Sequence, residues 1–561
     1  MKKLKDVFWD SLKLTVPFGI VISLLILYGE VNLNSIMMYG LVDVKPVGIQ
    51  PHNVIHALIA FFFSVGLLFA AIAKRYYIDR DPAPMEVFSH SVISPSSDKR
   101  KAQNHPVPEE YLSNQPKGLT IGKYGNRYVT LPYKSSPEHQ LILGSPGSHK
   151  SSTIINGLIY NYNFASEKER FHAGLIVDCK PELSQKSVDE TRDDIKVISP
   201  TSFDRFGFNP LYGLNPDSED DVLGKRCSTI AQAVIANPGG KNGFFYKSAQ
   251  NILSGRLMYG FRHGVSLGEI VTEMRDLPTE DLITEIMEDA SMSEHPKIKK
   301  RVRAYEGKDS DAFQDIVMSI QEDLDAFDDD AVIHCFADSN PRRASPEDLV
   351  NGVSLFVAIP SNLIFNYAPV FRVLITLCLD HILSIPEWKR KNKRPYWFLI
   401  DEAGSIGPIP NLKLALSQGR SFGIMLSIVV QSFAQLIETY GKDGADSILD
   451  CCKTTIVTSC NSIMTQRILS EWCGTYRETK LSKSSRGNGF ISSSRNENIE
   501  YRPIMDVSDI KRLEGTFKAL VFVKGDWFLV TKAPYFKIPL LDNKSKEICS
   551  ANRQFYPDVS D

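Results

Sequence analysis

Two long apolar stretches stand out in the hydrophobic pattern near the start of the chain. Leu14–Tyr28 is almost entirely apolar, and Val54–Ala73 contains only His56 and Ser64 as polar residues. The second stretch, with 20 residues, matches the apolar thickness of a bilayer, and the first, with about 15–17, is near the lower limit for a span. We predict two membrane spans, at about residues 12–29 and 54–73. A signal-peptide core is the alternative for the first stretch and a buried core helix for the second.

Basic residues flank these two stretches on their outer sides. Three lysines precede the first predicted span, and Lys74, Arg75 and Arg80 follow the second, whereas the connecting loop carries Glu30, Asp43 and Lys45. Positive charge favours the cytoplasmic side of a membrane. We therefore expect a multi-pass protein of the cell membrane with both termini in the cytoplasm.

Short apolar runs alternate with helical periodicity over much of the remaining chain, which predicts an α/β fold with a parallel sheet. A helix is expected from Pro369 to Leu383. Strands or strand pairs are expected at Leu119–Pro132, Leu141–Leu143, His172–Asp178, Gly352–Pro360, Tyr396–Ile400, Gly423–Val430, Thr454–Ser459 and Ala519–Thr531.

The segment from about residue 216 to 345 has a different character, because its periodicity is helical throughout. Helices are expected at Val222–Ile235, Phe244–Phe261, Thr279–Ser291 and Asp311–Phe327. The acidic run from Glu280 to Asp330 indicates either a solvated helix face or a docking surface, and phosphate repulsion disfavours DNA there. We interpret this segment as a helical domain inserted into the α/β domain.

Composition adds little to this division. The chain has 561 residues, 43% of them hydrophobic, and a formal net charge of −2, which neither favours nor excludes a nucleic-acid partner. The nine cysteines show no metal-ligand spacing. Reduced thiols of a cytoplasmic domain are therefore expected.

A candidate phosphate-binding loop follows the strand that ends at Leu143. It reads Gly144-Ser145-Pro146-Gly147-Ser148-His149-Lys150-Ser151-Ser152 and precedes an apolar helix. The pattern is G-x-x-x-x-G-K-[ST], in which backbone N–H groups at a helix N-terminus hold the phosphates of a nucleotide. Lys150 would reach the β- and γ-phosphates of ATP, and the Ser151 hydroxyl would ligate Mg²⁺. An ordinary turn before an ordinary helix is the alternative.

His149 replaces the second glycine of this pattern. A residue with a Cβ in the left-handed conformation costs roughly 1–2 kcal/mol, although histidine tolerates that conformation better than most residues. The substitution leaves slow or weakened nucleotide turnover as an open alternative.

Two further strand ends carry candidate chemistry. The apolar strand Tyr396–Ile400 ends in Asp401-Glu402. In an ATPase such an aspartate holds Mg²⁺ and the glutamate orients the attacking water. The strand ending at Val430 is followed by Gln431, which is placed either to sense the γ-phosphate or to make structural hydrogen bonds.

These patterns divide the chain into a membrane anchor (1–78), a linker (79–118), a nucleotide-binding domain in two parts (119–215 and 346–541), the all-α domain (216–345) and a polar tail (542–561). The Ser-, Gly- and Asn-rich segment from Lys480 to Glu500 is expected to be a flexible loop.

The ordered motifs resemble those of the VirD4/TraG-type coupling proteins of type IV secretion and conjugation systems. Beside the two spans and the phosphate loop, Asp178–Leu183 resembles D-P-K-G-E-L, and Asp401–Pro410 resembles D-E-F-x-x-L-G-x-I-P. Further motifs are Phe208–Leu211, Gly419–Ile424 and Val430–Ser432. Cys179-Lys180-Pro181 departs from the family's Pro-Lys-Gly, as His149 departs from glycine.

The resemblance implies a RecA-like P-loop NTPase motor domain with an inserted all-α domain, assembled as a homohexamer on the inner membrane. It implies that ATP and Mg²⁺ are bound, and that relaxase-bound single-stranded DNA or an effector protein is delivered to the secretion channel. By position, Lys150 and Ser151 carry over as nucleotide and Mg²⁺ ligands, Asp401 as the Mg²⁺ acid, Glu402 as catalytic base and Gln431 as sensor. Arg420 is a candidate for contacting a neighbouring subunit's phosphate.

Two functions of different classes follow. An ATP-driven translocation motor is favoured by the presence of Lys150, Ser151, Asp401 and Glu402. A membrane-bound cargo-recruitment platform with little hydrolysis is favoured by His149 and the acidic helices. A chromosome-partitioning translocase is disfavoured, since no winged-helix module is recognisable after the motor.

Overall fold

The computed structural model describes residues 105–131, 138–237, 243–308, 310–390, 394–484 and 494–556, with the backbone alone for 477–484 and 494–499. The chain divides into two units, Met1–Pro84 and Met85–Asp561, and the described residues belong to the second. Both predicted membrane spans lie outside the described residues. Among the helices within the described ranges, none has the length and apolarity that a membrane crossing requires.

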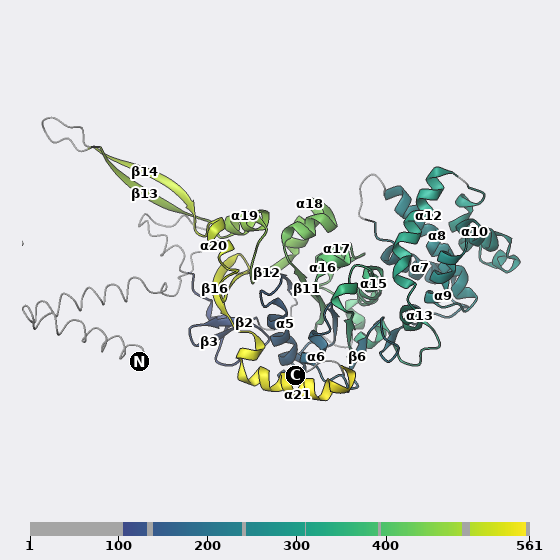
Figure 1. Cartoon of the computed structure of the whole chain (residues 1–561), viewed down its shortest axis with the longest axis horizontal. Coiled ribbons are helices and arrows are strands. Elements are labelled where there is room, and N and C mark those ends of the chain that lie inside the picture. Colours follow the sequence, from purple (N-terminus) through teal and green to yellow (C-terminus); the bar gives the residue numbers. More distant parts are fainter. Residues whose placement is uncertain are drawn as a thin grey trace, which may run out of the picture. The chain divides into compact units, whose positions relative to one another are not determined.

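A twelve-stranded sheet organises the described part of the chain (Figure 1). Seven neighbouring strands, from β12 to β6, run parallel, and the strands beyond β12 are antiparallel. In sheet order the strands are β1 (Leu112–Ser113), β3 (Arg127–Leu131), β2 (Leu119–Tyr124), β16 (Asp526–Lys532), β15 (Lys518–Val523), β12 (Cys452–Val457), β4 (His139–Leu143), β11 (Ile424–Val430), β10 (Tyr396–Ile400), β5 (Gly174–Asp178), β9 (Ser354–Ala358) and β6 (Ile195–Ile198).

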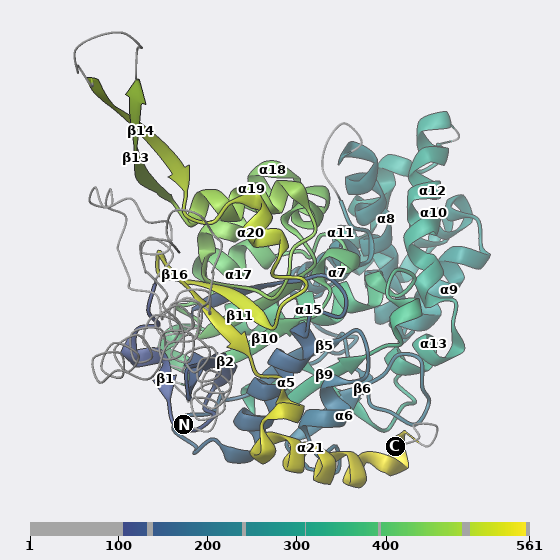
Figure 2. The same ribbon diagram turned by 60° about the vertical axis from the view of Figure 1, so that its left-hand side comes forward.

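The central strands are apolar on both faces because helices cover both. Successive residues of a strand point to opposite faces, so Leu141 joins one hydrophobic cluster and Ile142 the other. Helices α5 (Lys150–Ile159), α6 (Leu183–Ser187) and α21 (Pro539–Asn552) contribute to the second cluster, and Figure 2 shows them on one side of the sheet.

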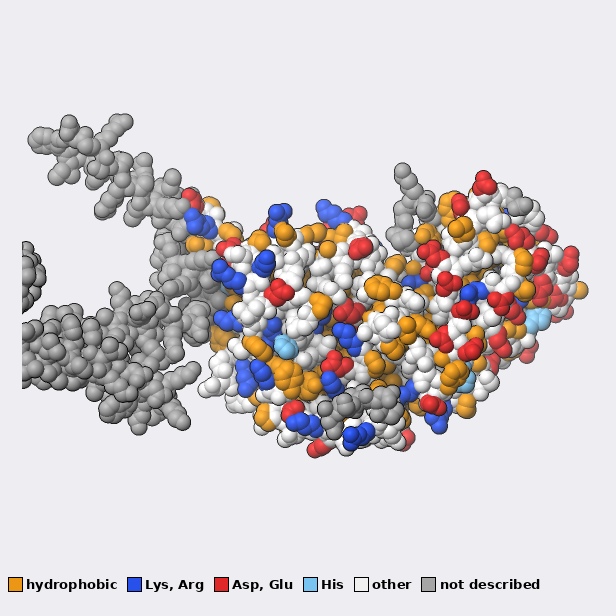
Figure 3. Space-filling view, in the orientation of Figure 1, with side chains coloured by type: hydrophobic (Ala, Val, Ile, Leu, Met, Phe, Trp, Pro, Cys, Tyr) orange, Lys and Arg blue, Asp and Glu red, His pale blue; other side chains and the backbone are white. Residues whose placement is uncertain are grey.

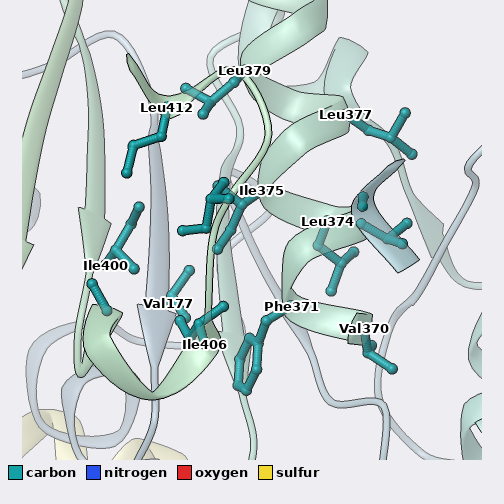
Figure 4. Close-up of a cluster of buried hydrophobic side chains, with 14 of the residues drawn as sticks. Val177, Val370, Phe371, Leu374, Ile375, Leu377, Leu379, Ile400, Ile406 and Leu412 are labelled. Atoms are coloured by element: carbon teal, nitrogen blue, oxygen red, sulfur yellow. The ribbon is translucent and has the colours of Figure 1, made fainter. Parts of the chain in front are cut away.

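The opposite face is covered by α15 (Ala368–Ser384), α16 (Ala403–Ile406), α17 (Leu412–Gln418) and α18 (Phe433–Cys451). Figure 4 shows Phe371 and Ile375 of α15 beside Val177 and Ile400 of the sheet. This packing fixes the end of β10, which is the strand that precedes Asp401.

Between Asp220 and Phe336, every element within the described residues is helical. The α-helices are α7 (Asp220–Val234), α8 (Gly243–Arg262), α9 (Leu267–Asp276), α10 (Thr279–Glu288), α11 (Pro296–Val302), α12 (Asp311–Leu324) and α13 (Asp330–Phe336). Figure 3 shows acidic side chains gathered over this helical part. The parallel pair β7 (Gly207–Phe208) and β8 (Arg343–Ala344) closes the base of the insertion.

Arg372 of α15 joins the helical insertion to the sheet domain. Its buried guanidinium donates to the carbonyl oxygens of Ala233 (2.7 Å) and Val234 (2.6 Å) at the end of α7, and to that of Ile406 (3.1 Å) in α16. It also lies 3.1 Å from an oxygen of Asp323 in α12. One side chain thus contacts two helices of the insertion and the short helix that follows Glu402.

The segment from Lys480 to Glu500, expected to be a loop, carries two strands in the described residues. β13 (Thr475–Ser484) and β14 (Ser494–Pro503) pair in antiparallel register, and residues 485–493 between them lie outside the described residues. Figures 1 and 2 show the pair extending away from the large sheet. The prediction failed because strand pairing is carried by backbone hydrogen bonds, which a Ser-rich composition does not prevent.

The predicted polar tail and linker are also partly structured. Helix α21 occupies most of the tail, buries Leu541 and Ile548, and packs on α6 and α5. Its Asn552 accepts a hydrogen bond from the Glu190 N–H (3.0 Å) and donates to the Val188 carbonyl (2.8 Å). A small number of apolar residues at helical spacing is enough to anchor a mostly polar helix, which is why the polar composition did not indicate it. In the linker, Tyr111 is buried and β1 pairs with β3.

Candidate nucleotide-binding site

The sheet topology places three of the sequence motifs side by side. Strand β11 lies between β4 and β10 and runs parallel to both. The carboxyl ends of parallel strands meet at one edge of a sheet. The phosphate loop after β4, Gln431 after β11 and Asp401-Glu402 after β10 therefore converge at the same edge.

The phosphate loop has the backbone conformation of a glycine-containing turn. Gly147 has φ 76°, and His149 has φ 70° and ψ 25°, directly before α5 begins at Lys150. His149 thus adopts the left-handed conformation that the missing glycine would take. Ser151 and Ser152 are half-buried in the first turn of α5. The loop leads directly into the N-terminus of α5, where the free backbone N–H groups of the first turn favour an anion.

Two residues that directly follow strand β12 brace this loop, and the sequence did not single them out. Ser459 Oγ accepts from the Ser145 N–H at 2.8 Å, and Thr458 Oγ1 bonds to Ser148 Oγ at 2.8 Å. Thr458 is in turn fixed by its N–H to the Leu143 carbonyl (2.8 Å). The only sequence signal was the polar end of the strand predicted at Thr454–Ser459.

Lys150 lies buried between the loop and the acidic strand end. Its Nζ donates to the Gly144 carbonyl and is 3.7 Å from Glu402 Oε1. Burial lowers the pKa of Lys150, and the carboxylates of Glu402 and Asp401 oppose that shift. The structure therefore brings a buried cation and two carboxyl groups together.

Asp401 and Glu402 occupy contrasting environments. Asp401 is 4% exposed, and burial together with the neighbouring Glu402 charge raises its pKa to about 6. Glu402 has φ 51°, and its N–H donates to Asp401 Oδ1 at 3.1 Å. Non-glycine residues held in this region of φ/ψ space cluster at functional sites. The strained Glu402 backbone aims its carboxyl group toward Lys150 and Gln431.

Gln431 contacts the predicted base directly. Its Nε2 donates to Glu402 Oε2 at 3.2 Å, and its N–H donates to Gln435 Oε1 at 2.8 Å. Both of the roles foreseen for Gln431 involve hydrogen bonding, and this geometry makes Glu402 its partner.

The Asp178–Leu183 motif acts as a brace beside the site. Fully buried Asp178 accepts from the N–H groups of Leu183 (2.8 Å) and Ser184 (3.0 Å) at the start of α6. Cys179, at the position where the motif departs from proline, donates its thiol to the Asp401 carbonyl at 3.1 Å. Burial raises the pKa of Asp178 well above its ordinary value.

Arg420 is not brought to this edge. It is exposed and lies between α17 and β11, at the amino end of that seven-residue strand. At about 3.3 Å per residue, the strand separates it from Gln431 by roughly 20 Å. Within one chain Arg420 does not reach the phosphate loop.

Gly144 and Gly147 are needed for different reasons, so replacing each by alanine should have a different effect. A Cβ at Gly144 would overlap Thr458 Oγ1 and Ser148 Oγ, whereas one at Gly147 meets nothing within 4 Å and is opposed only by its positive φ. Gly144→Ala should abolish binding of tripolyphosphate, measured by calorimetry. Gly147→Ala should only weaken it, by about 1–2 kcal/mol of strain. Equal effects of the two substitutions would contradict the brace between the loop and β12.

The buried carboxyl group of Asp401 should lower the free energy of unfolding at neutral pH. Its folded-state pKa of about 6 exceeds the ordinary value of 3.8. The folded state therefore binds the proton more tightly, and the free energy of unfolding falls as pH rises from about 4 to about 6. Asp401→Asn should be more stable than the wild type by roughly 2–3 kcal/mol at pH 7.5 and by much less at pH 4. The test is urea unfolding without Mg²⁺ or nucleotide, with the exposed Asp443→Asn as control. A pH-independent difference would refute this.

Comparison with known proteins places this geometry in a family. The family model described as type IV secretory system conjugative DNA transfer matches residues 96–556. Relatives include the type IV secretion system-coupling protein VirD4 of Bartonella quintana, 28% identical over 29% of this chain and 25% of that protein. Another is the conjugal transfer protein TraG of Rhizobium radiobacter, 25% identical over 64% of this chain and 57% of that protein.

Solved structures support the same fold. The plasmid coupling protein TrwB, in complex with a non-hydrolysable ATP analogue, matches with a TM-score of 0.55 at 18% identity, covering 80% of this chain and 95% of that one. The likeness shows that this chain shares the fold of that protein. The chain therefore belongs to the coupling-protein family of type IV secretion and conjugative DNA transfer.

Proposed function

We propose that this chain is a membrane-anchored, homohexameric ATPase that delivers relaxase-bound single-stranded DNA, or an effector protein, to the type IV secretion channel. The observation that carries the ATPase proposal is the convergence of Lys150, Glu402 and Gln431. Lys150 Nζ lies 3.7 Å from Glu402 Oε1, and Gln431 donates to the other oxygen at 3.2 Å. A cation, a base and a polar amide thus share the edge where the phosphate loop ends.

The chain's own residues suit a nucleoside triphosphate. The N-terminus of α5 offers backbone N–H groups and partial positive charge. Lys150 would exchange its bond to the Gly144 carbonyl for the β- and γ-phosphates. The nucleotide would thereby replace the buried Lys150–Glu402 contact and leave the Glu402 carboxylate available for water.

Mg²⁺ fits the donor set at this edge. The Ser151 hydroxyl and the Asp401 carboxylate are hard oxygen ligands, which Mg²⁺ prefers, and the ion keeps most of its other ligands as phosphate and water. Among the described residues, no group of three or more His, Cys, Asp or Glu side chains forms a metal cage. Bound Mg²⁺ would offset phosphate charge and stabilise ionised Asp401, whose carboxyl is otherwise costly to charge in this site.

Glu402 is the general base of the proposal, and Gln431 positions it. Glu402 would orient water for in-line attack on the γ-phosphate. The hydrogen bond from Gln431 holds one carboxylate oxygen, so a movement of Gln431 toward the γ-phosphate would free that oxygen. Gln431 would thus couple the state of the nucleotide to the base.

Proteins similar to this chain support the proposals of nucleotide binding and of DNA transfer. TrwB structures contain ATP and GTP analogues, and ADP with Mg²⁺. This chain spans a quarter of the length of VirD4 and 57% of that of TraG. Its own activity and cargo are therefore part of the proposal. Arg420 lies at the amino end of β11, away from the phosphate loop, and in the proposed homohexamer it would act on a phosphate of the next subunit.

Membrane attachment completes the proposal and rests on the sequence. The two apolar stretches and the basic residues outside them support a two-span anchor in the inner membrane, with both termini in the cytoplasm. The sheet domain and the helical insertion would then lie on the side where cargo and ATP are found.

A recruitment platform with impaired hydrolysis is the second candidate, favoured by His149. His149 has the left-handed backbone conformation that a glycine would adopt there, but its side chain adds an imidazole beside the loop. The platform would bind ATP and cargo with little turnover. The motor and the platform both bind ATP and cargo, but only the motor hydrolyses ATP at a useful rate.

ATP hydrolysis by the full chain in detergent, with and without single-stranded DNA, separates them. We expect DNA-stimulated hydrolysis that Lys150→Ala abolishes. Glu402→Gln should lower it by about 10²–10⁴-fold while ATP binding remains, because the base is lost and the phosphate loop is kept. Lys546→Ala, an exposed change on α21, is the control.

His149→Gly decides the alternative. Unchanged or modestly altered hydrolysis in this variant supports the motor. No hydrolysis in the wild type, restored by His149→Gly, would contradict the motor and support the platform.

A further inference from the structure

An aromatic cluster surrounds His149 at the mouth of the phosphate loop. The imidazole is stacked on the ring of Phe517, with 5.4 Å between centroids and 29° between planes. The ring of Phe536 lies 6.0 Å from the imidazole at 57°. We call His149, Phe517 and Phe536 the aromatic cluster.

The antiparallel strands β15 and β16 bring this cluster to the loop. Phe517 directly precedes β15, and Phe536 follows β16 by four residues, so both lie where the hairpin meets the carboxyl end of β12. Lys532, at the end of β16, donates from its buried Nζ to the carbonyls of Thr458 (2.8 Å) and Ser148 (3.4 Å). The cluster is thus held in place against the phosphate loop.

The two phenylalanine rings are exposed, although both contact the imidazole of His149. Phe517 is 46% exposed and Phe536 is 45% exposed. Lys537 Nζ lies 3.6 Å from the Phe517 ring centroid, and this lysine is itself exposed. Burial, with Lys532 and Lys537 nearby, lowers the pKa of His149. Partly exposed aromatic rings next to an imidazole and an exposed ammonium group suit a flat, electron-rich heterocycle carrying a phosphate, which would take the place of Lys537 on the Phe517 ring.

We propose that the aromatic cluster is the nucleobase-binding face of the site, with the base stacked on the exposed rings of Phe517 and Phe536. This rests on the proposed binding of a nucleoside triphosphate to the phosphate loop. His149 directly precedes Lys150 in the loop, so the two phenylalanine rings lie beside the phosphate site. The base of a nucleotide bound there, joined to the β-phosphate through the α-phosphate and the ribose, would extend from the loop onto these rings. Lys537, displaced from the Phe517 face by the base, reaches toward the α-phosphate.

The proposal gives His149 a function at the position where glycine is expected. His149 has the left-handed backbone that a glycine would take at this position, and its imidazole stacks on Phe517. Stacking does not distinguish bases, because every base presents a π-face. ATP and GTP should therefore bind this chain with similar affinity.

Binding of ATP, GTP and tripolyphosphate, each with Mg²⁺, to the full chain tests the proposal by calorimetry. Tripolyphosphate has no base, so it reports on the phosphate loop alone. Phe517→Ala and Phe536→Ala should each weaken ATP and GTP alike, by roughly 5- to 150-fold, and leave tripolyphosphate affinity unchanged. Phe536→Trp should retain ATP affinity. His149→Asn, which tolerates the left-handed backbone but lacks an aromatic ring, should also weaken ATP selectively.

Phe203→Ala is the matched control. Phe203 is also an exposed phenylalanine (60%) that packs on a histidine, His334, at 5.3 Å, but it follows β6 at the far end of the sheet. Its substitution should change no affinity. Retained tripolyphosphate binding shows that each variant is folded at the loop.

The outcomes separate two failures. Equal weakening of ATP and tripolyphosphate in the phenylalanine variants, or no weakening of either, would overturn the stacking proposal while leaving the nucleotide site intact. A wild-type chain that binds neither ATP nor tripolyphosphate would overturn the proposed function and the stacking proposal with it.

Discussion

The parallel alignment of β4, β11 and β10 is the constraint on which the rest of the site depends. Each strand ends in a different chemical group, and only a shared direction brings the phosphate loop, Gln431 and Asp401-Glu402 to one edge. Both faces of these strands must be buried to stabilise that arrangement, and α5 and α15 cover them from opposite sides. The hydrophobic core therefore sets the distances between the polar groups.

This arrangement places charges where solvation is poor. Lys150 and Asp401 are both nearly inaccessible to water. Burial lowers the pKa of Lys150 and raises that of Asp401, so it favours the neutral form of each side chain. The pairing of Lys150 with Glu402 offsets part of that cost. Left-handed backbone at both His149 and Glu402 adds strain on either side of the same site. The site is maintained by the packing around it, and a nucleotide with Mg²⁺ would supply the charges that it lacks.

Much of the fold could be predicted from the sequence, because the central strands are continuous apolar runs, and those that border the site are followed by glycine, an acid or glutamine. The phosphate loop, Asp401-Glu402 and Gln431 were located by those strand ends. Residues that act through tertiary contacts were not: Thr458, Ser459 and Phe517 reach the loop only when strands distant in sequence pair. Arg420 belongs to the Gly419–Ile424 motif but lies at the opposite edge of the sheet. The β13–β14 pair and α21 were missed because their polar composition conceals backbone pairing and a sparse apolar face.

The most direct test of the account is a crystal structure of the chain with Mg²⁺ and a non-hydrolysable ATP analogue. The account predicts that Lys150 Nζ leaves the Gly144 carbonyl and contacts the β- and γ-phosphates, while Ser151 and Asp401 lie at the metal ion and Glu402 faces the γ-phosphate. Phosphates bound away from the Gly144–Ser151 loop, or a Lys150 that stays on Glu402 and Gly144 with the analogue present, would contradict it.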